Sequence, residues 1–138
     1  MTERLEIGRV IESTRTLSQD DFDRFAALSG DDNPIHVDPQ FAATTRFGRT
    51  VSHGMLLYGV LCAAVHENFP GATQLGQDLM FPSPTFAGEE ITVRLEVTGA
   101  EPGTGQRTPG LRLAVVMTKA NGETVCQGEA LLTRRQAE

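Results

Sequence analysis

The chain has 138 residues, of which 39% are hydrophobic and 22% charged. This is the size and composition of a single globular domain with a buried core, so we expect residues 1–138 to form one domain. The 18 acidic and 12 basic side chains give a net charge of −6, which argues against general nucleic-acid binding. No apolar run approaches the ~20 residues of a membrane helix. The first residues lack the apolar segment of a signal peptide, so we expect a cytoplasmic protein.

The sequence pattern predicts a strand, then a helix-rich middle, then strands to the end. Ser18 with Asp21 three residues later is typical of a helix start, and Gly30 of a helix end. Asp38 followed by Pro39 predicts the start of a short second helix. In chain order, the expected elements are a strand over 8–16, helices over 19–28, 40–44 and 54–68, and strands over 73–81, 90–100, 111–119 and 124–134.

The helix predicted over residues 54–68 is apolar nearly all round, which is typical of a buried helix. Ser52 is the expected cap of this helix, and the Pro-Gly pair at 70–71 its stop. Asn121-Gly122 is a strong hairpin signal between the last two strands, and residues 101–109 read as a flexible hairpin loop. A sheet wrapped around one buried helix is the economical arrangement, so we predict an α+β fold.

The cysteines and histidines do not form a recognisable metal-binding pattern. Cys62 and Cys126 lie in apolar contexts, where free buried thiols are expected. His36, His53 and His66 are never at the close spacing of helical metal ligands, and there is no CxxC pair. We therefore expect no metal site.

The polar segment 28–38 is the part of the chain best suited to chemistry. Asp31 and His36 lie five residues apart, and the Asn-Pro pair between them should fold the chain back so that the two side chains converge. A carboxylate and an imidazole together supply a proton acceptor and a proton donor near neutral pH. A loop rich in Gly, Asp, Asn and Pro is usually just a turn, so the spacing alone gives only weak support for a pairing of Asp31 with His36.

This segment, Leu-Ser-Gly-Asp-Asp-Asn-Pro-Ile-His-Val-Asp over 28–38, resembles the hydratase 2 motif of the MaoC-like (R)-specific enoyl-CoA hydratases and dehydratases. Residues 50–57 are similar to the family segment that opens its central helix. The resemblance extends over nearly the whole chain and implies the hot-dog fold, a curved antiparallel sheet wrapped around one long central helix. It also implies a homodimer or a dimer of dimers.

The resemblance implies roles for individual residues. Asp31 and His36 match the catalytic dyad that holds one water, and Asn33 matches a residue that shapes this polar site. Gly54 matches the glycine whose N–H binds the thioester carbonyl oxygen, a role that the unpaired N–H groups of a helix start also favour on physical grounds. His53 either lines the substrate pocket or braces the loop through a bond from its ring to a backbone carbonyl, and we favour bracing.

The activity implied is reversible hydration of trans-2-enoyl-CoA to (R)-3-hydroxyacyl-CoA, with coenzyme A as part of the substrate and no cofactor. We favour Asp31 as the base and His36 as the acid and water orienter, although the sequence leaves this assignment open. An alternative is a 3-hydroxyacyl-[acyl carrier protein] dehydratase of fatty-acid synthesis. A hot-dog acyl-CoA thioesterase and a non-catalytic acyl-thioester binder are also conceivable, but the intact dyad argues against both.

Two further groups of residues are candidates for substrate contacts. Arg46 and Arg49, in the loop before the central helix, either meet the phosphates of the carrier or are simply solvated. Four apolar or weakly polar residues are candidates for an acyl pocket, although core packing explains them equally well: Tyr58, Cys62, Val65 and Leu131.

Overall fold

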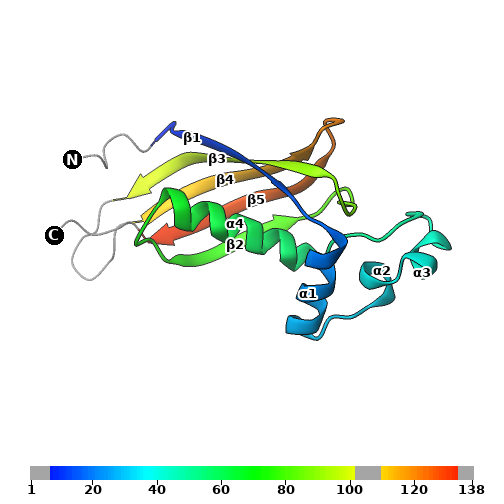
Figure 1. The fold of residues 1–138 in the computed structure, drawn as a ribbon. Helices are drawn as coiled ribbons and strands as arrows, with labels where there is room; N and C mark the ends of the chain where they lie inside the picture. Colours follow the sequence, from blue (N-terminus) through cyan, green and yellow to red (C-terminus); the bar gives the residue numbers. More distant parts are fainter. Residues whose placement is uncertain (1–6, 102–109, 134–138) are drawn as a thin grey trace.

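The computed structural model describes residues 7–101 and 110–133. Its elements are β1 (Val10–Thr16), α1 (Gln19–Ser29), α2 (Pro34–Val37), α3 (Pro39–Ala43), α4 (Gly54–Asn68), β2 (Gln74–Met80), β3 (Glu90–Glu101), β4 (Gly110–Lys119) and β5 (Thr124–Thr133). The strands form one antiparallel sheet in the order β1-β3-β4-β5-β2. The long helix α4 lies across one face, and α1, α2 and α3 gather beyond one end of the sheet (Figure 1).

The predicted α+β arrangement and order of elements are confirmed. Ser18 caps α1 in a reciprocal pair of bonds: its hydroxyl accepts from the N–H of Asp21, and the Asp21 carboxylate accepts from the N–H of Ser18. Gly30 ends α1 with a φ of 85°, a conformation that favours glycine. The predicted hairpin at Asn121-Gly122 joins β4 to β5, with Gly122 at a φ of 90°. The predicted loop over 101–109 lies almost wholly outside the described residues.

The core forms where α4 packs against one face of the sheet (Figure 1). Side chains along a strand point alternately to the two faces, so every second residue is buried along β4 and along residues 91–97 of β3. These strand residues and the buried side of α4 together make up one hydrophobic cluster. The helix contributes Leu57, Val60, Leu61, Ala64 and Val65.

The prediction that α4 is buried all round is wrong for one side of the helix. The sheet covers only the side facing it. On the other side, Met55 is 57% exposed and His66 is also exposed. Within the described ranges, no helix is long and apolar enough to cross a membrane.

Two local predictions in the helical region are also wrong. Ser52 does not cap α4; the N-cap is His53, and the Ser52 hydroxyl donates instead to the carbonyl oxygen of His53. The stretch expected to be a turn after Asp31 forms the short helix α2. Asn33 caps it by accepting from the N–H of Ile35, and proline occupies the first turn, where no N–H partner is needed.

Candidate active site

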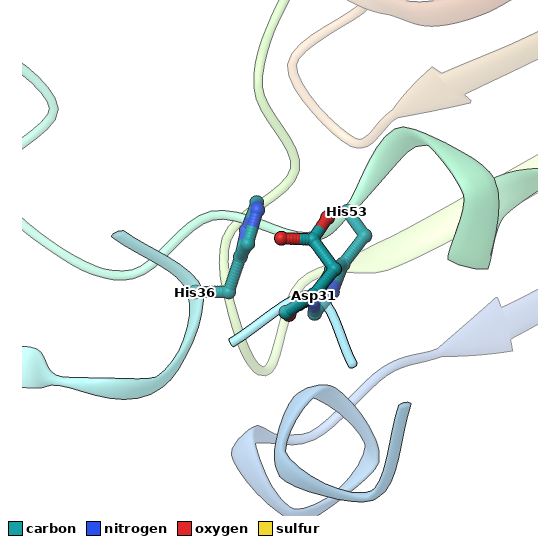
Figure 2. Close-up of side chains that lie close together, drawn as sticks. All are labelled: Asp31, His36 and His53. Atoms are coloured by element: carbon teal, nitrogen blue, oxygen red, sulfur yellow. Dashed lines mark hydrogen bonds between the residues drawn. The ribbon is translucent and has the colours of Figure 1, made fainter. Parts of the chain in front are cut away.

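Three polar side chains meet where α1, α2 and the start of α4 come together. Asp31 lies in the loop between α1 and α2, His36 on α2, and His53 at the N-cap of α4. Each contributes one carboxylate oxygen or ring nitrogen, and these three atoms lie within 4.8 Å of one another. Figure 2 shows the Asp31 carboxylate pointing toward the ring of His36. The chain does fold back between residues 31 and 36, as the sequence predicted.

The main chain holds Asp31 in place while its carboxylate remains exposed. Gly30 turns the chain out of α1, and the hydroxyl of Ser29 accepts from the N–H of Asp31 at 3.1 Å. Asn33 then starts α2 through its cap. Asn33 therefore shapes the polar loop through the backbone, and its side chain is exposed.

The ring of His36 is held by the segment that precedes α4. Its Nδ1 lies 2.8 Å from the carbonyl oxygen of Val51, whose own N–H donates to the carbonyl of Ile35. Because a carbonyl oxygen only accepts, Nδ1 carries the proton in this contact. In the neutral ring, Nε2 is then a free acceptor, which is the atom that can accept a hydrogen bond from a water or a substrate.

Sequence reasoning missed the side chain that ties these segments together. The amide of Gln19, at the start of α1, donates to the carbonyl of His36 at 2.9 Å and accepts from the hydroxyl of buried Thr50 at 2.6 Å. It thus bridges α1, α2 and the strand-like segment before α4. Nothing in the sequence distinguishes this glutamine from any other residue in the first turn of a helix.

His53 is the buried member of the group, with 2% of its surface exposed. Its Nε2 donates to the carbonyl oxygen of Asp31 at 2.9 Å. Its ring stacks on that of His36, with centroids 3.8 Å apart and 22° between the planes, and the ring of Phe25 meets it edge-on at 4.7 Å. Desolvation by burial lowers the pKa of His53.

The three groups are poorly arranged to share a metal ion. A metal binds an imidazole in the plane of the ring, along the nitrogen lone pair, at about 2.0 Å for zinc. The rings of His36 and His53 are nearly parallel and 3.8 Å apart. The planes of these two rings do not intersect near either ring, so one ion cannot lie in both planes and bind a nitrogen of each ring. The arrangement is better suited to a water held between Asp31 and His36.

Gly54 is the first residue of α4, and its N–H has no partner among the described residues. A glycine at this position has no side chain to hinder the approach of a substrate. The ring of Phe81, in the segment after β2, instead fills this space: a Cβ on Gly54 would lie 2.9 Å from the nearest ring carbon. Both residues line a surface hollow between that segment and the start of α4. Phe81 is 40% exposed and is a residue that the sequence pattern did not suggest.

Comparison with known proteins identifies the family of this chain. The family model described as MaoC like domain matches residues 3–126. The chain belongs to the MaoC-like family. It is 36% identical over 130 residues to an (R)-specific enoyl-CoA hydratase of Aeromonas caviae, which covers 93% of this chain and 94% of that protein. It is also 38% identical over 87 residues to a mitochondrial 3-hydroxyacyl-[acyl-carrier-protein] dehydratase of Arabidopsis thaliana, covering 63% of this chain and 52% of that one.

Among solved structures, the unliganded R-hydratase PhaJ1 of Pseudomonas aeruginosa superimposes with a TM-score of 0.87 at 35% identity, covering 96% of this chain and 83% of that one. The predicted hot-dog fold is thereby confirmed. This MaoC-like chain is a hydro-lyase of acyl thioesters, a hydratase or dehydratase.

The two candidate phosphate-binding arginines of this MaoC-like domain have different surroundings. The guanidinium of Arg49 lies over the ring of Phe86 and 3.6 Å from the carboxylate of Glu89. Arg46 lies over the ring of Phe47 and lines the same hollow as Gly54. Arg46 is therefore the better placed of the two to meet a carrier bound there, since Arg49 is already paired.

The four candidate pocket residues are not all brought together. Tyr58 and Cys62 face β2, where the Tyr58 hydroxyl donates to Gln77, and the thiol of Cys62 accepts from Gln74. Val65 belongs to the core. Leu131 lies on the opposite face of the sheet from its buried neighbours on β5, so it is separated from the other three.

Both cysteines are free thiols, as predicted. Burial raises the pKa of Cys126 to about 11. The thiol is therefore protonated at neutral pH and behaves as a small core side chain.

Proposed function

We propose that this protein hydrates trans-2-enoyl-CoA to (R)-3-hydroxyacyl-CoA, reversibly and without a cofactor. The observation that carries the proposal is the convergence of the Asp31 carboxylate and the His36 ring at the start of α4. The (R)-specific hydratase of Aeromonas caviae, similar over nearly the full length of both chains, supports the choice of substrate and stereochemistry.

In the proposed mechanism, one water lies between the dyad residues. It donates one hydrogen bond to the Asp31 carboxylate and one to the free Nε2 of His36, which leaves an oxygen lone pair for C3 of the substrate. Asp31 takes the proton as the C3–O bond forms, and the π electrons of the C2–C3 double bond move toward the thioester oxygen. Asp31 then returns this proton to C2 on the same face, which completes a syn addition. Because Nε2 of His36 is an acceptor, His36 orients the water and does not act as the acid that the sequence analysis favoured.

The negative charge that develops on the thioester oxygen needs a donor. We assign this role to the Gly54 N–H, which is unpaired at the start of a helix of 15 residues. The partial positive charge of a helix N-terminus favours an oxyanion there. The ring of Phe81 lies over this position and must shift or pack against the thioester when the substrate binds.

Crotonyl-CoA tests the proposal directly. We expect loss of the enoyl absorbance with no release of free thiol, since hydration consumes the double bond and leaves the thioester intact. Thiol release at the same rate as enoyl loss would identify a thioesterase instead. Binding of crotonyl-CoA without any turnover would identify a non-catalytic binder.

The second candidate function is dehydration of 3-hydroxyacyl-[acyl carrier protein]. It is supported by the similarity to the Arabidopsis thaliana dehydratase, although that match covers a shorter part of the chain. The dyad and its chemistry would be the same. Comparing kcat/KM for crotonyl-CoA and crotonyl-[acyl carrier protein] separates the two, and we expect the coenzyme A thioester to be the better substrate.

We also propose that the protein forms a homodimer, alone or as part of a dimer of dimers, through the β2 edge of the sheet. This outermost strand and the residue after it carry exposed apolar side chains, with Leu75 at 59%, Met80 at 58% and Phe81 at 40%. An uncovered edge of this kind favours pairing with another chain. Sedimentation equilibrium at micromolar concentration should give at least twice the monomer mass; a fully active monomer would contradict the proposal.

A further inference from the structure

We propose that His53 is a positioning residue that holds both members of the dyad at once. It binds the main chain of Asp31 through its Nε2–H and forms the surface on which the His36 ring rests. This inference rests on the hydration activity proposed above, and it identifies the group that sets the spacing between the two catalytic side chains.

The two contacts fix different parts of the dyad. The Nε2–H of His53 lies 2.9 Å from the carbonyl oxygen of Asp31, a good hydrogen-bond distance. Any movement of that peptide would carry the Asp31 carboxylate with it. At its edge, the His36 ring is held by one hydrogen bond, from Nδ1 to the carbonyl oxygen of Val51. A single hydrogen bond would leave the ring free to tilt about it. Stacking on His53 at 3.8 Å removes that freedom and fixes the direction of Nε2.

His53 is itself held rigidly. It is 2% exposed, and the ring of Phe25 packs against its edge. It follows that a displacement of His53 would be transmitted to Asp31 and His36 together, because it touches both. A displacement of about 1 Å at a catalytic group costs on the order of 100-fold in rate.

The surroundings of His53 also favour its neutral form. Because Nε2 donates to a carbonyl, Nδ1 is unprotonated, and it is buried without a partner among the described residues. A second proton would place a buried charge against the His36 ring. Desolvation lowers the pKa of His53, with a smaller contribution from His36, while the bond to the Asp31 carbonyl and the charge of Asp31 act in the opposite direction. Among the residues that the structure describes, those two are the titratable groups that act on His53.

Two substitutions separate the two contacts. His53→Gln retains an N–H donor close to the position of Nε2 but removes the ring, whereas His53→Phe retains an aromatic face for His36 but removes the donor. With crotonyl-CoA we expect kcat to fall about tenfold or more in each variant, with KM within about twofold, since the substrate is still bound but the water is misplaced. The control is His66→Gln on the exposed side of the same helix, which should leave both constants unchanged.

The unfolding temperature provides a second readout. The pKa of His53 is lower in the folded protein than in the unfolded chain, where it is near 6.5. As the pH falls below about 6.5, the unfolded chain therefore binds the proton more readily than the folded protein does, and the fold loses stability. Between pH 7.5 and 5.5, the wild type should therefore lose more in Tm than His53→Gln does. Equal losses in the two proteins would contradict a neutral, buried His53.

Nitrogen-15 NMR of histidine-labelled wild-type protein covers the case in which a variant fails to fold. We expect His53 as the neutral Nε2–H tautomer at pH 7, and we expect Nδ1 of His36 to carry a proton. The proposal is overturned if His53 is observed as a freely titrating imidazole, or if a folded His53→Gln and a folded His53→Phe both keep wild-type kcat. If the wild type hydrates no enoyl thioester, the proposed function fails, while the NMR and Tm results still decide the placement of His53.

Discussion

Replacing Asp31 with Asn should lower kcat for enoyl-CoA hydration on the order of 10² to 10⁴-fold, the usual contribution of a general acid or base. The amide is nearly the same size as the carboxylate but cannot accept the proton of the water. The fold should be unaffected, because the carboxylate is exposed and the contacts of Asp31 run through its main chain. Steady-state kinetics with crotonyl-CoA measure the loss of kcat, and circular dichroism checks that the fold is unchanged. The matched control is Asp32→Asn at the adjacent exposed carboxylate, which should retain wild-type kcat.

Replacing His36 should cost a similar factor, but the choice of substitution matters. His36→Ala removes the acceptor and also the bond to Val51 and the stack on His53. His36→Asn keeps an amide N–H that can reach the Val51 carbonyl in place of Nδ1, so it removes the Nε2 acceptor with less disturbance. Turnover close to wild type in folded Asp31→Asn or His36→Asn would rule out the dyad mechanism.

Gly54→Pro should reduce kcat about 10²-fold relative to Gly54→Ala, equivalent to ~3 kcal/mol for one oxyanion donor. Proline removes the N–H proposed to bind the thioester oxygen, and alanine keeps it. Proline is tolerated at the first position of a helix. The residue before it, His53, has φ −62° and ψ 142°, which suits a following proline. The measurement is kcat with crotonyl-CoA for both variants, after each is shown to be folded.

The contact with Phe81 must be controlled in this comparison. Either substitution adds a Cβ about 2.9 Å from the Phe81 ring, so both variants displace that ring. Repeating the pair in a Phe81→Ala background removes this shared effect. If proline still retains as much kcat as alanine there, the Gly54 N–H does not bind the thioester oxygen.

The sequence predicted those parts of the structure that depend on local signals. The Ser18–Asp21 cap, the Gly30 terminator and the strand alternation of β3 each depend on residues close together in the chain. The convergence of Asp31 and His36 was also predicted, because the short segment that joins them lies within the motif itself.

The remaining features depend on contacts between distant segments. Phe81, which follows β2 in the chain, contacts Gly54 at the start of α4. The stack of His53 on His36 joins residues 17 positions apart. Helix α2 was missed for a different reason, since an Asn followed by Pro is both a turn signal and a helix start. Here the cap from Asn33 to the N–H of Ile35 decides in favour of the helix.

Hydration of crotonyl-CoA in ¹⁸O-labelled water, with chiral analysis of the product, tests the central claim most directly. We expect (R)-3-hydroxybutyryl-CoA with the label on the C3 hydroxyl, formed at similar rates by wild type and Asp32→Asn but far more slowly by Asp31→Asn. Label in a free carboxylic acid, with release of coenzyme A, would show attack at the thioester carbon and contradict it. So would a product of mixed or (S) configuration.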